Sequence, residues 1–231
     1  MNLILQGTLI AFKGAPITLY VSAIAVFMGI TIGLVLALMK MSRNKLVSFI
    51  STAYIEIIRD TPLIVQALIF AYGLPQVLQK SGIQFKWPYL IIPAIIVCGL
   101  NSAAYVAEII RSGLQAVDKG QMEAARSLGM TYWQAMKIVI IPQAFKIAIP
   151  AFGNEFVTMI KETSVLSYVG VVEILRRGAL WNAATFNTFA AYIGVAICYF
   201  CFTFPLSKLM AYVEKKLSTE EPKPRKKKKT A

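Results

Sequence analysis

Residues 123–142 read EAARSLGMTYWQAMKIVIIP and form a polar, amphipathic block in the middle of the chain. Long apolar runs precede this block and follow it, so it interrupts sequence that is otherwise suited to a lipid bilayer. The block carries too many charges and amides to lie in hydrocarbon, where buried polar groups are costly. It therefore predicts a water-exposed helical hairpin between two membrane-spanning segments.

The composition of the chain is that of an integral membrane protein. The 231 residues are 57% hydrophobic and 15% charged, with a mean hydropathy of +0.63. Three charge-free runs cover residues 14–39, 87–107 and 178–207. A helix needs about 20 apolar residues to cross a bilayer. The first run is longer than the apolar region of a signal peptide and lacks a small-x-small exit, so we expect it to be retained as a span.

We predict an all-α integral membrane protein with about five transmembrane helices and the hairpin between the third and fourth. The predicted spans are 17–39, 61–79, 89–107, 144–161 and 190–210. Residues 48–60 are amphipathic and lead into the second span, and 163–187 are too polar to cross. Gly29 and Gly33 have the spacing of close helix packing. The membrane domain covers 1–217, and the basic tail 218–231 should be disordered.

Lys and Arg residues determine the expected orientation. Placing the first loop, the central polar loop and the C-terminus on one side gathers 18 of the 24 basic residues there. Because cytoplasmic loops carry the excess of positive charge, this side is cytoplasmic and the N-terminus is outside. We expect a multi-pass protein of the cell membrane, with the tail either attracted to anionic headgroups or acting only as a solubilising end.

Several classes of function are disfavoured. The chain has no histidine, which removes imidazole general-base chemistry and imidazole metal ligation. Cys98, Cys198 and Cys201 all lie in apolar runs, as small buried hydrophobes do, and predict no metal site. The net charge of +13 is concentrated in the tail and beside the spans, so it does not indicate nucleic acid. We predict no catalytic residues and no enzymatic activity in this chain.

Two interpretations of the hairpin remain open from spacing alone. Glu123, Ala124, Ala125 and Leu128 fall at helical spacings, and Gly129 can end one helix before a second begins. The small alanines would leave room for another protein surface. The alternative is an interfacial helix that lies on lipid.

Six ordered blocks of sequence resemble the permease subunits of ABC importers, and specifically the branch that carries polar amino acids. They are 14–22, 56–66 (EIIRDTPLIVQ), 102–111 (SAAYVAEIIR), 120–130 (GQMEAARSLGM), 142–156 (PQAFKIAIPAFGNEF) and 161–164 (KETS). The likeness is collinear over about residues 14–217. Asp60 departs from the glycine common in this family, and Val139 and Ile141 replace the usual Ile and Leu.

The resemblance implies partners and a mechanism. The chain would dimerise with an identical or paralogous permease and would dock a separate ATP-binding cassette ATPase through the EAA hairpin. The hairpin residues that would contact the ATPase are Glu123, Ala124, Ala125, Leu128 and Gly129. An extracellular or periplasmic binding protein would deliver the substrate. This chain has no Gly-x-x-x-x-Gly-Lys-Ser/Thr loop, so ATP and Mg²⁺ would lie on the partner and no cofactor on this chain.

Two carboxylates mark a candidate substrate site. Glu155 and Glu162 are seven residues apart, which places them on one helical face about 10 Å apart, with Thr158 between. Carboxylates inside a span are costly and indicate function by default. They would suit a cationic amino acid such as arginine, lysine or histidine. Alternatively, Glu162 pairs with Lys161 and Glu155 locks a neighbouring helix.

Further polar groups extend this candidate site. Asn101 and Tyr105 lie one turn apart in the third span and serve either to bind substrate or to join helices. Thr61, beside Pro62, offers freed backbone groups that could line a cavity. We place Arg59 in a charge network near the cytoplasmic gate or on a solvated face. The two charge sets treated in this way are Glu56-Arg59-Asp60 and Glu108-Arg111.

Three functions are compared. The first is a polar amino acid importer subunit, with a cationic preference or with glutamine or another neutral polar amino acid as its cargo. The second is an ion-coupled secondary transporter, which explains the carboxylates but not the hairpin, and the chain has no evident internal repeat. The third is a membrane enzyme, which no constellation of residues supports.

Overall fold

The computed structural model describes residues 3–218, and helices are the only regular secondary structure in that part. The long helices are α2 (Ala15–Lys40), α3 (Lys45–Asp60), α6 (Ile91–Ala116), α9 (Ile141–Glu162) and α11 (Thr188–Ser218). The shorter elements are α1 (Leu3–Phe12), α4 (Leu63–Leu68), η1 (Ile69–Gly73), α5 (Leu74–Lys80), α7 (Lys119–Ser127), α8 (Tyr132–Ala135), η2 (Met136–Ile140), η3 (Thr163–Val169) and α10 (Ile174–Thr185).

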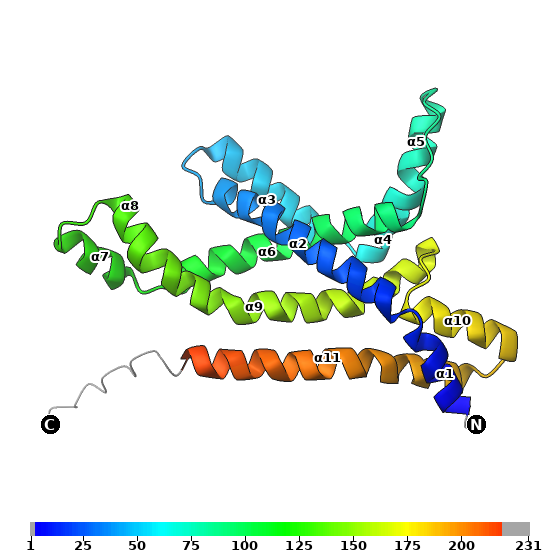
Figure 1. Cartoon of the computed structure of the whole chain (residues 1–231). Helices are drawn as coiled ribbons and strands as arrows, with labels where there is room; N and C mark the ends of the chain where they lie inside the picture. The colour runs from blue at the N-terminus through cyan, green and yellow to red at the C-terminus, as the bar shows by residue number, and fades with distance from the viewer. Residues whose placement is uncertain (1–2, 219–231) are drawn as a thin grey trace, which may run out of the picture.

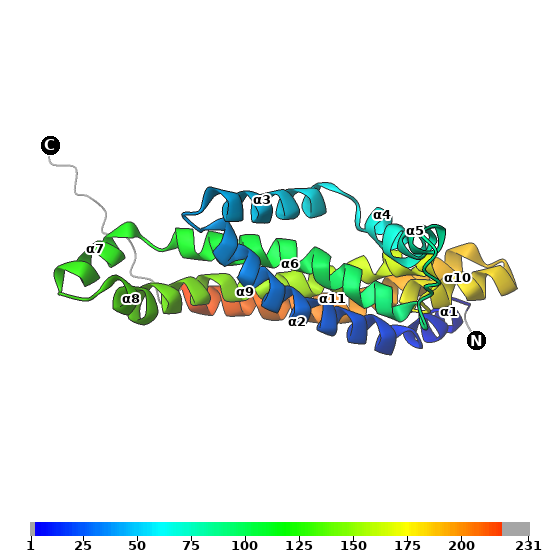
Figure 2. The ribbon, with the colours of Figure 1, turned by 90° about the horizontal axis from the view of Figure 1, so that it is seen from above.

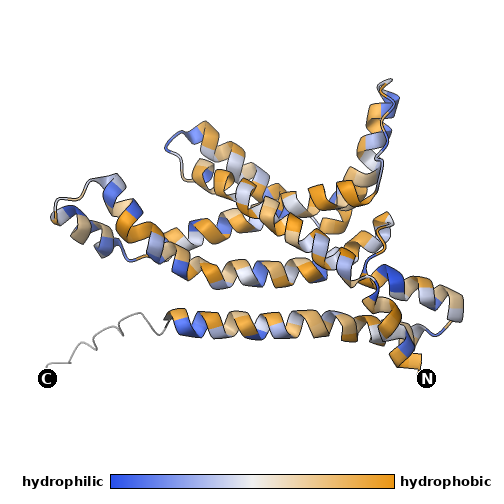
Figure 3. Ribbon diagram, viewed as in Figure 1, coloured by the Kyte–Doolittle hydropathy of each residue, from blue (hydrophilic) through white to orange (hydrophobic). Residues whose placement is uncertain are grey.

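The helices form an elongated bundle with distinct ends. α9 and α11 run alongside each other, and α2 crosses α6 obliquely (Figures 1 and 2). α1 and α10 lie at one end, whereas α7, α8 and the C-terminal end of α11 lie at the other (Figure 1). Apolar residues dominate the long helices, and α7 is largely hydrophilic (Figure 3). The predicted tail falls almost entirely on 219–231, outside the described residues.

Membrane-spanning helices are present in the expected number. Four continuous helical stretches are long and apolar enough to cross a bilayer: 15–40, 91–116, 132–169 and 188–217. A bent pair, 45–60 with 63–80, would make a fifth. The all-α membrane fold is therefore confirmed for the part of the chain that the structure describes.

The second span differs from the predicted straight segment 61–79. The helix that follows α3 is bent by 102° away from the α3 axis. Pro62 cannot donate a backbone hydrogen bond, so the helix ends at Asp60 and restarts at Leu63. The second arm also contains the π-helical turn η1 before it continues as α5. The predicted amphipathic run 48–60 is part of α3 and forms the other arm of the bend.

The third span extends further than predicted. α6 continues nine residues beyond Ala107 and ends at Ala116, which shortens the predicted polar loop 108–141. Its polar end is stabilised by ion pairs: Glu108 lies 2.7 Å from Lys40 Nζ and 2.7 Å from Arg111 Nη2. The predicted Glu108–Arg111 network is confirmed, with Lys40 of α2 as its third member. Because pairing lowers the cost of burying these charged side chains, the helix can continue here without exposing them fully to water.

Close packing of α2 on α6 builds the centre of the bundle. A Cβ at Gly29 would lie 2.6 Å from Ser102 Oγ, and one at Gly33 would lie 2.8 Å from the Ala103 carbonyl oxygen. The two glycines therefore allow a helix contact that alanine would prevent. This confirms the packing role predicted from their spacing.

A buried glutamate organises the end that carries α1 and α10. Glu173 has no exposed surface and caps α10 by accepting hydrogen bonds from the Leu175 and Arg176 amides, both at 2.7 Å. Tyr199 Oη of α11 donates a third bond, also at 2.7 Å. Burial raises the pKa of Glu173, although the three donors act in the opposite direction. α10 has 12 residues, too few to span, which agrees with the polar segment predicted at 163–187.

Candidate functional site

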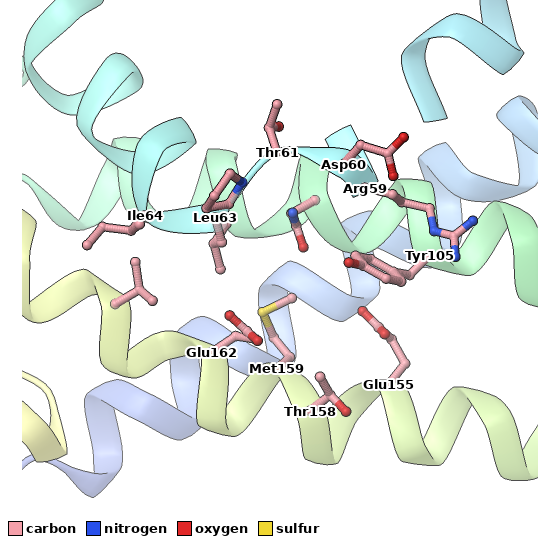
Figure 4. A pocket seen from close by; sticks show the side chains of 13 residues that line it. Arg59, Asp60, Thr61, Leu63, Ile64, Tyr105, Glu155, Thr158, Met159 and Glu162 are labelled. Carbon is pink, nitrogen blue, oxygen red and sulfur yellow. The ribbon is translucent and has the colours of Figure 1, made fainter. Parts of the chain in front are cut away.

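A cavity of about 660 Å³ lies between the α3–α4 connection, α6 and α9 (Figure 4). All six residues predicted to contact substrate line it. Its lining consists of Arg59, Asp60, Thr61, Pro62, Leu63, Ile64, Asn101, Tyr105, Glu155, Thr158, Met159, Glu162 and Val165. The structure thus brings together polar groups from three separate regions of the sequence, as a binding site for a small polar molecule requires.

α9 supplies the acidic wall of the cavity. Glu155 and Glu162 project from this helix toward the α3–α4 connection (Figure 4). Glu155 is 8% exposed, and Ser102 Oγ of α6 donates a hydrogen bond of 2.8 Å to its Oε1. Glu162 is half-buried and lines the cavity, and between residues 3 and 217 it forms no ion pair with Lys161.

Two predicted alternatives for these carboxylates can now be compared with the structure. The alternative in which Glu162 pairs with Lys161 is not found among residues 3–217. Glu155 does join a neighbouring helix, through Ser102, and it lines the cavity as well. Its second oxygen and the Glu162 carboxylate are the carboxylate acceptors that α9 offers to a molecule in the cavity.

The connection between α3 and α4 forms the opposite wall. Arg59 and Asp60 face the cavity here, and the Arg59 guanidinium lies 5.3 Å from the centre of the Tyr105 ring. A cation at this distance is attracted to the face of the aromatic ring. The predicted network of Glu56, Arg59 and Asp60 is wrong: within residues 3–217 no ion pair joins them. The alternative interpretation, a solvated face, agrees with the exposure of all three side chains, and Arg59 and Asp60 also line the cavity.

The charges in the cavity are predominantly negative. Asp60, Glu155 and Glu162 contribute carboxylates, and Arg59 contributes a guanidinium. Charges act strongly on one another when low-dielectric walls exclude water. The arrangement favours a ligand with positive charge, and the Arg59 end offers a place for an anionic group. Within residues 3–218, no cluster of His, Cys, Asp or Glu could hold a metal ion.

Sequence reasoning missed Arg59 and Asp60 as parts of the cavity lining, and Ser102 and Gln66 as residues that support it. Asp60 was read together with its charged neighbours rather than with Thr61, the residue that follows it. Ser102 follows Asn101 directly, but its contact with Glu155 lies 53 positions along the chain. Gln66 does not line the cavity and supports its wall from behind. The sequence signal that could have indicated these residues is that each is a polar residue next to or within an apolar run.

A second candidate surface is the hairpin of α7 and α8. Asp118 caps α7 by accepting a bond from the Gly120 amide, and Gly129 makes the turn with a φ of +85°. Thr131 and Gln134 then form a capping box that begins α8. The hairpin therefore has a defined start and turn, and it lies at one end of the bundle, where α8 continues through η2 into α9 (Figure 1).

The hairpin exposes a large apolar surface. Leu128 is 83% exposed and Trp133 is 77% exposed, and Glu123 and Ala124 are also exposed. Ala125 is 4% exposed and packs inside the hairpin. Of the five residues predicted to contact a partner, Ala125 is therefore covered by the chain itself. Exposed aromatic and aliphatic side chains on a polar hairpin are typical of an interaction surface.

The sequence matches known proteins over most of its length. Residues 29–219 match the family model described as "Binding-protein-dependent transport system inner membrane component". The arginine transport system permease protein ArtQ of Bacillus subtilis is 37% identical, over 96% of this chain and 100% of that protein. The probable glutamine ABC transporter permease protein GlnM of the same organism is 39% identical, over 87% of this chain and 89% of that protein.

Solved structures share the arrangement of helices. A structure described as an amino acid ABC transporter with histidines is 42% identical and superimposes with a TM-score of 0.83, covering 92% of this chain and 96% of that one. The MetNI methionine ABC transporter in an inward-facing conformation is 18% identical, has a TM-score of 0.71 and covers 90% and 96%. At that identity the second likeness concerns the fold alone.

Proposed function

This chain belongs to the family of binding-protein-dependent transport system inner membrane components, and we propose that it is the permease subunit of an ATP-driven importer of polar amino acids. The proposal rests on one observation: polar and acidic side chains from α3, α6 and α9 converge on one cavity between the spans. Relatives named for arginine and for glutamine transport support amino acids as the class of substrate.

The cargo that the cavity suits best is a cationic amino acid. Its positive side chain would lie near Glu155 and Glu162, and its carboxylate would lie toward Arg59. A neutral cargo such as glutamine is the second candidate, supported by the relatives named for glutamine. Asn101, Thr61 and Thr158 could hydrogen-bond either kind of side chain.

Transport requires partners that this chain would engage at both ends. We expect a separate ATPase, carrying ATP and Mg²⁺, to grip the α7–α8 hairpin, while this chain binds no cofactor. A second permease, identical or paralogous, would complete the membrane unit, and an external binding protein would deliver the amino acid. α1 and the C-terminal end of α11 lie at opposite ends of the bundle, which agrees with an external N-terminus and a cytoplasmic C-terminus (Figure 1).

Amino-acid-stimulated ATP hydrolysis tests the cargo. The complete transporter is reconstituted in proteoliposomes, and stimulation by arginine is compared with stimulation by glutamine for wild type and Glu155→Gln. In Glu155→Gln the cargo would lose one hydrogen bond between its positive side chain and the Glu155 carboxylate. Such a charged hydrogen bond is worth about 2 kcal/mol, so its loss should raise the half-saturating arginine concentration about 30-fold. Glu56→Gln is the matched control, because Glu56 is exposed on α3 and does not line the cavity.

The outcomes separate the two cargoes. Stimulation by arginine that weakens only in Glu155→Gln supports a cationic cargo held by this carboxylate. Equal stimulation by glutamine, with no effect of Glu155→Gln, would leave the importer and remove the cationic site. If neither amino acid stimulates hydrolysis, the proposed class of substrate is wrong.

Capture of the ATPase tests the hairpin separately. Trp133→Ala should reduce co-purification of the ATPase, because a 77% exposed indole at the hairpin is a candidate anchor for a partner. Phe186→Ala is the control, since this aromatic ring is 89% exposed in the connection between α10 and α11. That connection lies at the opposite end of the bundle (Figure 1). Equal recovery of the ATPase with both variants would contradict docking at the hairpin and would favour a lipid-facing role.

A further inference from the structure

Gln66 is a buried glutamine that connects the break between α3 and α4 to α6. Its side chain is 7% exposed, although it belongs to a six-residue helix directly after the break. Its Nε2 donates to the Ile58 carbonyl at 2.8 Å, to the Thr61 carbonyl at 3.1 Å and to Thr61 Oγ1 at 2.8 Å. Its Oε1 accepts a bond of 3.2 Å from Asn101 Nδ2. Every polar atom of this amide therefore has a partner.

These bonds meet a need that the break creates. A helix end leaves backbone carbonyls without intrahelical donors, and Pro62 removes one further N–H. Water satisfies such groups at a protein surface, whereas in a membrane the protein must supply the donors. Gln66 supplies them to Ile58 and Thr61, and the Thr61 hydroxyl in turn donates to the Ile57 carbonyl at 2.7 Å.

The same side chain fixes two residues of the cavity. Thr61 and Asn101 line the cavity, whereas Gln66 does not, so its influence on a bound molecule must pass through them. The Asn101 bond also links the break to α6, a helix that packs along α2 and α9. A change in the bend would therefore move Thr61. A shift of Asn101 would weaken its hydrogen bond to Gln66, which is one of the contacts that hold the bend.

We propose that Gln66 is a positioning residue that holds the 102° bend between α3 and α4 and, through Thr61 and Asn101, the shape of the cavity wall. The effect on transport rests on the proposed function, whereas the effect on the bend does not. The two parts are therefore measured separately.

The bend is measured by pulsed EPR on the complete transporter in lipid. Spin labels are placed at Phe49 of α3 and Val77 of α5, which are 69% and 60% exposed. Helical rise and the 102° angle place these backbone positions about 25 Å apart, against about 40 Å for a straight helix. The three native cysteines are replaced first, and unlabelled subunits are added in excess to suppress distances between copies.

Gln66→Met is the test substitution, because it preserves side-chain length and removes the donors. Gln76→Met is the matched control, since Gln76 is exposed on α5. We expect a broadened or lengthened distance distribution for Gln66→Met only. Identical distributions for wild type and both variants would overturn the proposal.

Transport then tests the link to the cavity. Gln66→Met should raise the KM for the amino acid about tenfold, the worth of one buried hydrogen bond, with a smaller change in maximal rate. In an Asn101→Ala background the same substitution should raise the KM less, because the connection is already broken. An equal rise in both backgrounds would refute the route through Asn101. If wild type transports no amino acid while Gln66→Met alters the distance, the proposed function fails and the bend-holding role stands.

Discussion

Gly29→Ala should disturb the candidate site from a position that does not line it. The added Cβ would lie 2.6 Å from Ser102 Oγ, 2.8 Å from Ser102 Cβ and 3.1 Å from its backbone carbon. Distances below 3 Å require something to move, and the backbone of α6 blocks one direction. The Ser102 hydroxyl must therefore shift, although it is the donor that holds Glu155 Oε1 at 2.8 Å. A methyl group added to α2 would therefore weaken, through Ser102, the hydrogen bond to the Glu155 carboxylate of α9.

The expected cost has two parts. Overpacking a tight contact costs about 1–3 kcal/mol. Loss of a hydrogen bond to a charged group costs about 1.5–3 kcal/mol, and Glu155, at 8% exposure, has little water to replace it. We expect a total of about 4 kcal/mol. For a chain of this size, each kcal/mol lowers the melting temperature by about 2–4 °C, so the expected fall is about 10 °C.

Thermal unfolding of the purified transporter in detergent measures this effect. Gly73→Ala is the matched control, because a Cβ there would meet only the Ile69 side chain, at an ordinary 3.8 Å. Ser102→Ala removes the hydrogen bond without adding an atom, so Gly29→Ala should cost less in that background than in wild type. If Gly29→Ala lowers the melting temperature no more than Gly73→Ala does, the reasoning is refuted.

Two further predictions concern charged groups outside the cavity. Glu173→Leu should lower the free energy of unfolding by about 3 kcal/mol, because it leaves two partly buried amides of α10 unpaired, whereas Tyr199→Phe should cost only about 1 kcal/mol. Chemical denaturation of both variants measures the difference, and equal costs would contradict the capping role. Glu108→Gln should lower the free energy of unfolding by about 1 kcal/mol, because Lys40 and Arg111 lose a partly exposed ionic partner. The same denaturation measurement in high salt should show a smaller loss, and a salt-independent loss would contradict its ionic origin.

The spacing of residues along the chain predicted much of the candidate site. Glu155 and Glu162 had to share a face of any helix that contained both, because seven residues make two turns. The charge-free run 87–107 around Asn101 and Tyr105 placed these polar groups at membrane depth. Both arguments are local, so they required no knowledge of which helices are neighbours.

The positions of Arg59 and Asp60 could not be predicted in the same way. Pro62 indicated a break, but no local pattern shows the direction in which a broken helix continues. That direction depends on contacts such as the one between Gln66 and Asn101, 35 positions apart. These charges were therefore predicted to form a network near the cytoplasmic gate or to lie on a solvated face, whereas the structure places Arg59 and Asp60 on the cavity wall.

The sequence by itself determined the membrane fold, the approximate number of spans and the helical face that carries the acidic residues. These follow from hydropathy and helical periodicity, which act over one or two turns. Only the tertiary structure decided that the α3–α4 break, Asn101 of α6 and Glu155 of α9 enclose one cavity. The physical reason is that this arrangement depends on long-range contacts, the glycine contact between α2 and α6 and the hydrogen bonds at the bend.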